Sequence, residues 1–199
     1  GAGIGLPSGT QLYANLLNAA GTSVIATIPV NADGTYSFNN ITPNTNYTVQ
    51  LSINQGTVGA ATPVTALPTN WVNTGEDCCD NAGSDGTVNG LVSVAVTTSS
   101  VTNANFGIEQ LPNSGVNVQP SALLPSGTTQ VTVPASAFSG TDPDGGIITS
   151  IRITAFPADA TTIVINGTSY TVATFPVGGV TVPTNAAGQP TQTITVDPQ

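Results

Sequence analysis

The chain has 199 residues, of which one is arginine, none is lysine or histidine, and ten are aspartate or glutamate. The formal net charge of −9 disfavours nucleic acid and anionic membrane surfaces as partners, because phosphates would find almost no cation to contact. Without His and Lys the chain also lacks the commonest general base and the amine nucleophile, so we expect no enzymatic activity.

Hydrophobic residues make up 39% of the chain and charged residues 6%, a balance typical of a folded protein rather than a disordered one. β-Branched residues alternate with polar ones, and turn-forming residues interrupt them about every 8 to 12 positions. This pattern predicts an all-β fold, and no apolar run approaches the roughly 20 residues needed to cross a bilayer.

The length favours two domains, and residues 109–118 lose the alternation and gather Pro, Asn, Ser and Gly, which predicts a linker. We therefore expect two tandem β-sandwiches, at residues 1–112 and 113–199. In the first, the pattern predicts strands at residues 10–17, 23–29, 35–38, 47–53, 91–97 and 103–108. In the second, it predicts strands at residues 129–133, 147–156, 161–165, 169–174, 179–182 and 191–196.

A tight turn is expected at residues 31–34, because Gly34 accepts the positive φ that a hairpin turn requires. Tyr36 and Phe38 follow at alternating positions and should point into the core. Residues 30–51, VNADGTYSFNNITPNTNYTVQL, carry the pattern D-G-x-Y-x-F-x-x-hydrophobic-x-P. This pattern resembles the prealbumin-like Cna-B and SdrD-B repeats of bacterial surface adhesins.

Three further stretches extend the resemblance of the first domain to repeats in giant adhesins of gliding bacteria: GIGLPSGTQLY at 3–13, WVNTGE at 71–76 and NFGIEQLP at 105–112. The second domain, with AFSGTDPDGG at 137–146, resembles the immunoglobulin-like or cadherin-like repeats that accompany them. The resemblance implies a non-catalytic repeat of a long adhesin, displayed as a stalk or filament on the bacterial cell surface. Its partners would be neighbouring modules of the same protein, and surface glycans or other cells.

Many Cna-B modules carry an amide cross-link that needs a lysine, and this chain has none. Mechanical strength must then come from strand pairing or from a metal.

Two alternatives to a purely structural repeat stay open. One is a carbohydrate- or peptide-binding module, in which the single tryptophan, Trp71, could stack on a sugar, although we expect a core position for it. The other is a filament subunit whose open sheet edge accepts a strand from a neighbour.

Four of the ten carboxylates fall in one Gly- and Asn-rich stretch with no basic residue nearby: Glu76, Asp77, Asp80 and Asp85. Ca²⁺ prefers carboxylate and carbonyl oxygens in flexible loops, so this stretch is a candidate calcium site. The spacing does not match an EF-hand, and the alternative is a solvated acidic loop.

A second candidate calcium site is Asp142-Pro143-Asp144-Gly145, which has the D-x-D-G form of cadherin-like repeats. The alternative is a plain β-turn, for which these residue types are well suited.

Cys78 and Cys79 are adjacent, and their Cα atoms lie about 3.8 Å apart, below the usual disulfide range. We favour a vicinal disulfide that rigidifies the loop; the alternatives are free thiols or bonds to another chain.

Overall fold

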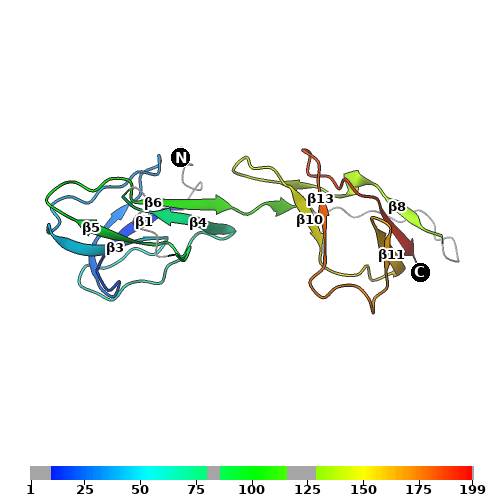
Figure 1. The fold of residues 1–199 in the computed structure, drawn as a ribbon, viewed down its shortest axis with the longest axis horizontal. Helices are drawn as coiled ribbons and strands as arrows, with labels where there is room; N and C mark the ends of the chain where they lie inside the picture. The colour runs from blue at the N-terminus through cyan, green and yellow to red at the C-terminus, as the bar shows by residue number, and fades with distance from the viewer. Residues whose placement is uncertain (1–9, 80–85, 116–128, 199) are drawn as a thin grey trace. The chain divides into compact units, whose positions relative to one another are not determined.

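The computed structural model describes residues 10–79, 86–115 and 129–198 (Figure 1). The chain divides into two compact units, Gly1–Leu111 and Pro112–Gln199, within one residue of the expected boundary. The described residues form fourteen strands and one short 3-10 turn, Ala135–Ala137. The protein is therefore all-β, built from antiparallel sheets, and none of the described segments is a helix that could span a membrane.

Unit 1 contains a four-stranded sheet with the order β2-β1-β3-β5 and a two-stranded sheet of β4 and β6. The bounds of its strands are β1 Tyr13–Asn18, β2 Val24–Pro29, β3 Thr45–Ser52, β4 Trp71–Asp77, β5 Leu91–Val96 and β6 Asn105–Gln110.

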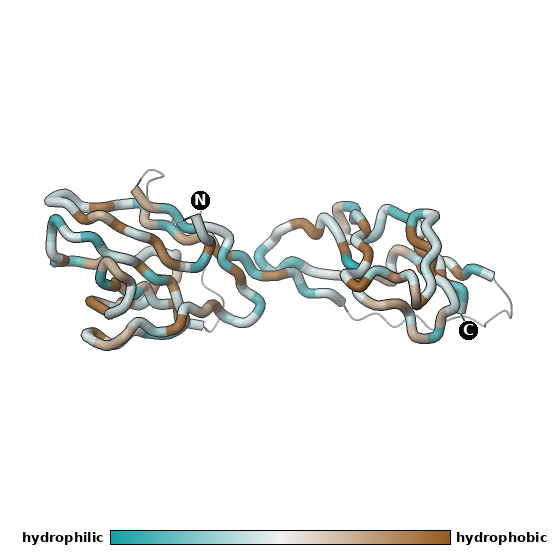
Figure 2. The backbone as a smooth tube through the Cα atoms, turned by 60° about the horizontal axis from the view of Figure 1, so that its bottom comes forward, coloured by the Kyte–Doolittle hydropathy of each residue, from teal (hydrophilic) through white to brown (hydrophobic). Residues whose placement is uncertain are grey.

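The core of unit 1 forms where alternate apolar residues of the strands are buried. Figure 2 shows short hydrophobic stretches (brown) interrupted by polar ones (teal) along the chain. The four-stranded sheet contributes every second residue of its central strands, and β6 contributes Phe106 and Ile108 from the other layer. The buried members of this core are Leu12, Ala14, Leu16, Val30, Tyr47, Val49, Leu51, Cys78, Val92, Val94 and Val96.

The expected turn at residues 31–34 is present, with Gly34 at φ 83° and its N–H donating to the carbonyl of Asn31 at 2.8 Å. The expected strand at 35–38 is wrong, because these residues pair with no strand. Tyr36 and Phe38 nevertheless pack against the core, as expected. The segment is held by side chains instead, since the hydroxyl of Tyr36 donates to the carbonyl of Ala104 at 2.6 Å.

Unit 2 contains three antiparallel sheets, of β7 and β9, of β10 and β13, and of four strands in the order β12-β11-β14-β8. The bounds of its strands are β7 Asn113–Ser114, β8 Val131–Val133, β9 Gly140–Thr141, β10 Ser150–Ile153, β11 Ala160–Ile165, β12 Thr168–Tyr170, β13 Val180–Pro183 and β14 Ile194–Pro198.

The core of unit 2 has four buried side chains, Ile163, Ile165, Val182 and Ile194. A cluster of aromatic rings extends it, with Phe175 at 6.0 Å from Phe156 and 5.8 Å from Tyr170 between centroids. Both contacts are edge-to-face, the arrangement that aromatic pairs favour.

The linker expected at residues 109–118 is wrong in part. Residues 109 and 110 complete β6, and Asn113–Ser114 forms β7, which pairs with Gly140 and Thr141 of unit 2. The strand expected at 147–156 is also shorter, because only Ser150–Ile153 pairs, with β13. In both places side-chain alternation is a poor guide, since pairing depends on a strand far away in the sequence.

Candidate functional site

The candidate acidic site begins at the end of β4, where Glu76 is only 7% exposed. Its two carboxylate oxygens accept hydrogen bonds from backbone N–H groups, Oε1 from Asn89 at 2.9 Å and Oε2 from Gly90 at 3.2 Å. Backbone donors of this kind satisfy a buried carboxylate without a cation. Glu76 therefore ties β4 to the turn before β5, a role that the sequence did not indicate.

The remaining members of the acidic stretch are not brought together by the described structure. Asp77 is the last residue of β4, and Asp80 and Asp85 lie outside the described residues. In the part of the chain that the structure describes, no three His, Cys, Asp or Glu side chains come close enough to share a metal ion. The calcium site at residues 76–85 therefore stays a proposal, with Glu76 already committed to backbone amides.

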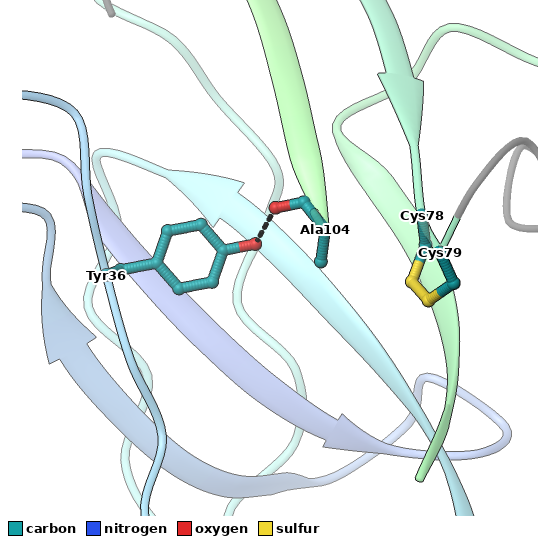
Figure 3. The surroundings of a disulfide bond; sticks show 4 residues. All are labelled: Tyr36, Cys78, Cys79 and Ala104. Atoms are coloured by element: carbon teal, nitrogen blue, oxygen red, sulfur yellow. Dashed lines mark hydrogen bonds between the residues drawn. A yellow bond between two sulfur atoms is a disulfide. The ribbon is translucent and has the colours of Figure 1, made fainter. Parts of the chain in front are cut away.

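Cys78 and Cys79 follow β4 directly and are joined by a disulfide (Figure 3). Cys78 is completely buried in the core of unit 1, and Cys79 packs against that core. Cys79 has φ 62°, a left-handed conformation that non-glycine residues rarely adopt. The bridge thus belongs to the end of the core rather than to an exposed loop tip.

The Asp142–Gly145 segment is a turn, since the N–H of Gly145 donates to the carbonyl of Asp142 at 3.3 Å. The carboxyl groups of Asp142 and Asp144 are close enough to interact. The hydrogen bond that the protonated carboxyl group of Asp142 donates to the carboxylate of Asp144 raises the pKa of Asp142, and partial burial and the negative charge of Asp144 act in the same direction. Two converging carboxylates are a start for calcium coordination, but they supply fewer oxygens than the 6 to 8 that calcium takes.

Unit 1 has a cavity of about 710 Å³ beside the motif Asp33–Phe38. Leu16, Val49 and Val94 line it from the four-stranded sheet, and Tyr36 and Phe38 line it from the facing segment. Burial raises the pKa of the Tyr36 hydroxyl, which stays protonated and bonded to Ala104. The cavity therefore offers apolar surface together with hydroxyl groups, of which that of Tyr36 stays protonated.

Trp71 opens β4 and is half-buried. It is not among the residues that pack against the core of unit 1, so the expected core position is not met. Part of Trp71 is thus accessible at the start of the strand.

A buried polar network on the other face of the four-stranded sheet was not expected from the sequence. We call Asn15, Gln50 and Ser52 the outer-face network; each is at most 1% exposed. Asn15 Nδ2 donates to Gln50 Oε1 at 2.9 Å and to the carbonyl of Asn54 at 3.0 Å, and Asn15 Oδ1 accepts from the N–H of Gly56 at 2.9 Å. These bonds fix the segment after β3 onto the sheet.

The other two members of the network hold the far end of the same segment. Gln50 Nε2 donates to the carbonyl of Pro63 at 2.9 Å and to Thr65 Oγ1 at 2.7 Å. Ser52 Oγ accepts from the N–H of Ala66 at 3.1 Å. Residues 54–66 are therefore fastened across the sheet by amide and hydroxyl groups, in a chain that has no lysine to form an amide cross-link.

No family model, curated protein or solved structure matches this chain.

Proposed function

We propose that this chain is a non-catalytic structural repeat of a long bacterial cell-surface adhesin, in which two β-sandwiches add length to a stalk or filament. The observation that supports it best is the use of buried polar groups in unit 1. The outer-face network and Glu76 bind backbone groups of the same chain, so they fasten segments together instead of converging on a cavity. Its partners are neighbouring modules of the same protein.

Single-molecule stretching of the chain between end handles tests the mechanical part of this proposal. Two separate unfolding events are expected, with length gains below about 400 Å for unit 1 and about 320 Å for unit 2, because an extended residue spans at most about 3.6 Å. The Gln50→Leu variant should lower the unfolding force of the longer event only. A single event, or equal effects on both events, contradicts two independently folded load-bearing units.

The location is tested on cells that produce the protein. Antibodies against the chain should label intact, unpermeabilised cells, and cells in which the gene is deleted should attach less to surfaces. Labelling that requires permeabilised cells argues against display at the cell surface.

A carbohydrate- or peptide-binding module is the second candidate, favoured by the cavity beside Tyr36 and by the half-buried Trp71. Glycan-array and peptide-array binding by the chain tests it, with Trp71→Ala and Phe38→Ala as separate variants. Binding that either variant abolishes, while the urea unfolding midpoint is kept, supports this candidate. Absence of binding on both arrays leaves the structural repeat as the better proposal.

A further inference from the structure

The four-stranded sheet of unit 1 ends in two edge strands, β2 and β5, and β2 is well protected. Its pairing with β1 contains a bulge, and its last residue is Pro29. At Val24 the backbone N–H and C=O are both used by the segment after β3, with Ala60 as acceptor at 3.0 Å and Gly59 as donor at 2.8 Å. Bulges, prolines and covering loops are the usual means of blocking an edge strand.

Among the described residues, the opposite edge, β5, has none of these protections. Its register with β3 runs without a shift from Leu91 to Val96, and the strand contains no proline and no charged residue. Ser93 and Ala95 are exposed, and both side chains are small. An edge of this kind is open to pairing with another strand.

The direction of the backbone groups follows from one hydrogen bond. The N–H of Leu51 donates to the carbonyl of Gly90 at 2.9 Å, so these two residues form a hydrogen-bonded pair. Because such pairs alternate along antiparallel strands, every second residue from Gly90 bonds toward β3. The N–H and C=O groups of the intervening residues, Leu91, Ser93 and Ala95, therefore point away from the sheet.

Part of this outward row is already used. The N–H of Leu91 donates to Asn89 Oδ1 at 2.9 Å. Within the described residues, the outward backbone groups of Ser93 and Ala95 bind no other backbone or side-chain group. Four strong hydrogen-bonding groups thus stand in a row at an exposed edge.

We propose that β5 is a self-association site, where it pairs antiparallel with β5 of a second copy of this chain. A two-fold axis at Val94 places Ser93 of each copy opposite Ala95 of the other, which gives four N–H to C=O bonds between the copies. The two four-stranded sheets then form one continuous eight-stranded sheet.

A second copy is favoured as the occupant because the free groups complement themselves under this rotation. The sequence around β5 also permits two copies of a −9 chain to approach, since residues 86–108 contain no acidic residue and Glu76, which binds Asn89 and Gly90, is only 7% exposed. The contact is small compared with the roughly 1,600 Å² of a standard interface, so we expect a weak dimer. Added salt should strengthen it, because salt screens the repulsion between two acidic chains.

Analytical ultracentrifugation of the full chain, up to about 1 mM to reach weak dimers, tests the proposal. A monomer–dimer equilibrium is expected, with an association constant that rises with sodium chloride. In the Ala95→Glu variant, each copy places one glutamate against the strand of the other copy. Because the two negative charges repel each other, the association constant should fall at least about tenfold. The matched control is Ile25→Glu on the blocked edge β2, which should leave the association constant unchanged.

Two NMR readouts place the contact at β5. The amide protons of Ser93 and Ala95 should become protected from exchange as concentration rises, and isotope-filtered spectra should show contacts between the Val94 α-protons of the two copies. Trp71 fluorescence during urea unfolding checks that each variant is folded. A monomer at every concentration, a dimer indifferent to Ala95→Glu, or assemblies that grow beyond the dimer each overturn the two-fold pairing.

Discussion

Replacing Asn15 with leucine tests whether the outer-face network holds unit 1 together. Leucine is close to asparagine in size, so the change removes hydrogen bonds without opening a large cavity. Two buried groups lose their partner, Gln50 Oε1 and the N–H of Gly56. The carbonyl of Asn54 also loses its bond, but Asn54 is exposed and its carbonyl can bind water. The hydroxyl of Thr27, which donates to Asn15 Oδ1 at 2.8 Å, is half-buried and can turn to water.

Each buried group left without a partner costs about 1–3 kcal/mol, so losing the partners of two such groups in Asn15→Leu should lower the free energy of unfolding of unit 1 by about 2–6 kcal/mol. That is a large share of the roughly 5–15 kcal/mol that a domain normally has. The control Thr27→Val removes one half-buried bond of the same network and should cost about 1 kcal/mol.

The assay is urea unfolding followed by the fluorescence of Trp71, which is the only tryptophan and lies in unit 1, so unit 2 does not contribute. Hydrogen exchange gives a local readout, and the amide of Gly56 should lose protection in Asn15→Leu but keep it in Thr27→Val. A loss below about 1 kcal/mol, with Gly56 still protected, would refute the view that these amides fasten the segment.

Two further predictions concern carboxylates. Glu76→Gln should lower the free energy of unfolding by about 1–3 kcal/mol in the same urea assay, because the amide leaves one of the two backbone N–H donors without an acceptor. Carbon-13 NMR titration should place the pKa of Asp142 above 3.8, owing to its hydrogen bond with Asp144, and that of Asp33 below 3.8, owing to the hydroxyl of Thr35. The stability that Asp142 contributes should therefore fall as pH rises through its raised pKa, and the Asp142→Asn variant should not show this loss. The stability that Asp33 contributes should instead fall as pH drops through its lowered pKa. Unshifted or reversed pKa values contradict the geometry of both turns.

Strand positions were predictable where alternation coincides with a partner strand. The strands at 23–29, 47–53 and 91–97 are present within about two residues, since β-branched residues there cover a core on one face. The segment 35–38 has the same alternation but no partner, and β4 has a partner but interrupted alternation, with a bulge at Asn73–Gly75. Local composition cannot distinguish these cases, because pairing is decided by contacts distant in sequence.

The candidate site was predictable only as a list of residue types. Crowded acids indicated a loop, yet Glu76 bonds to Asn89 and Gly90, more than ten residues later, and no spacing rule indicates such a contact. In the same way, alternation assigns Asn15 and Gln50 to the face away from the core. Their burial comes from residues 54–66, an irregular segment whose path no periodic pattern predicts.

The hydrogen bonds that hold residues 54–66 determine how the attachment of this segment depends on pH and ionic strength. The side chains that hold this segment are amides and hydroxyls, which carry no charge and do not titrate in the range of natural waters. Ions in solution weaken attractions between charges but leave such uncharged bonds almost unchanged. We therefore expect the attachment of this segment to be almost the same at low and at high salt concentration.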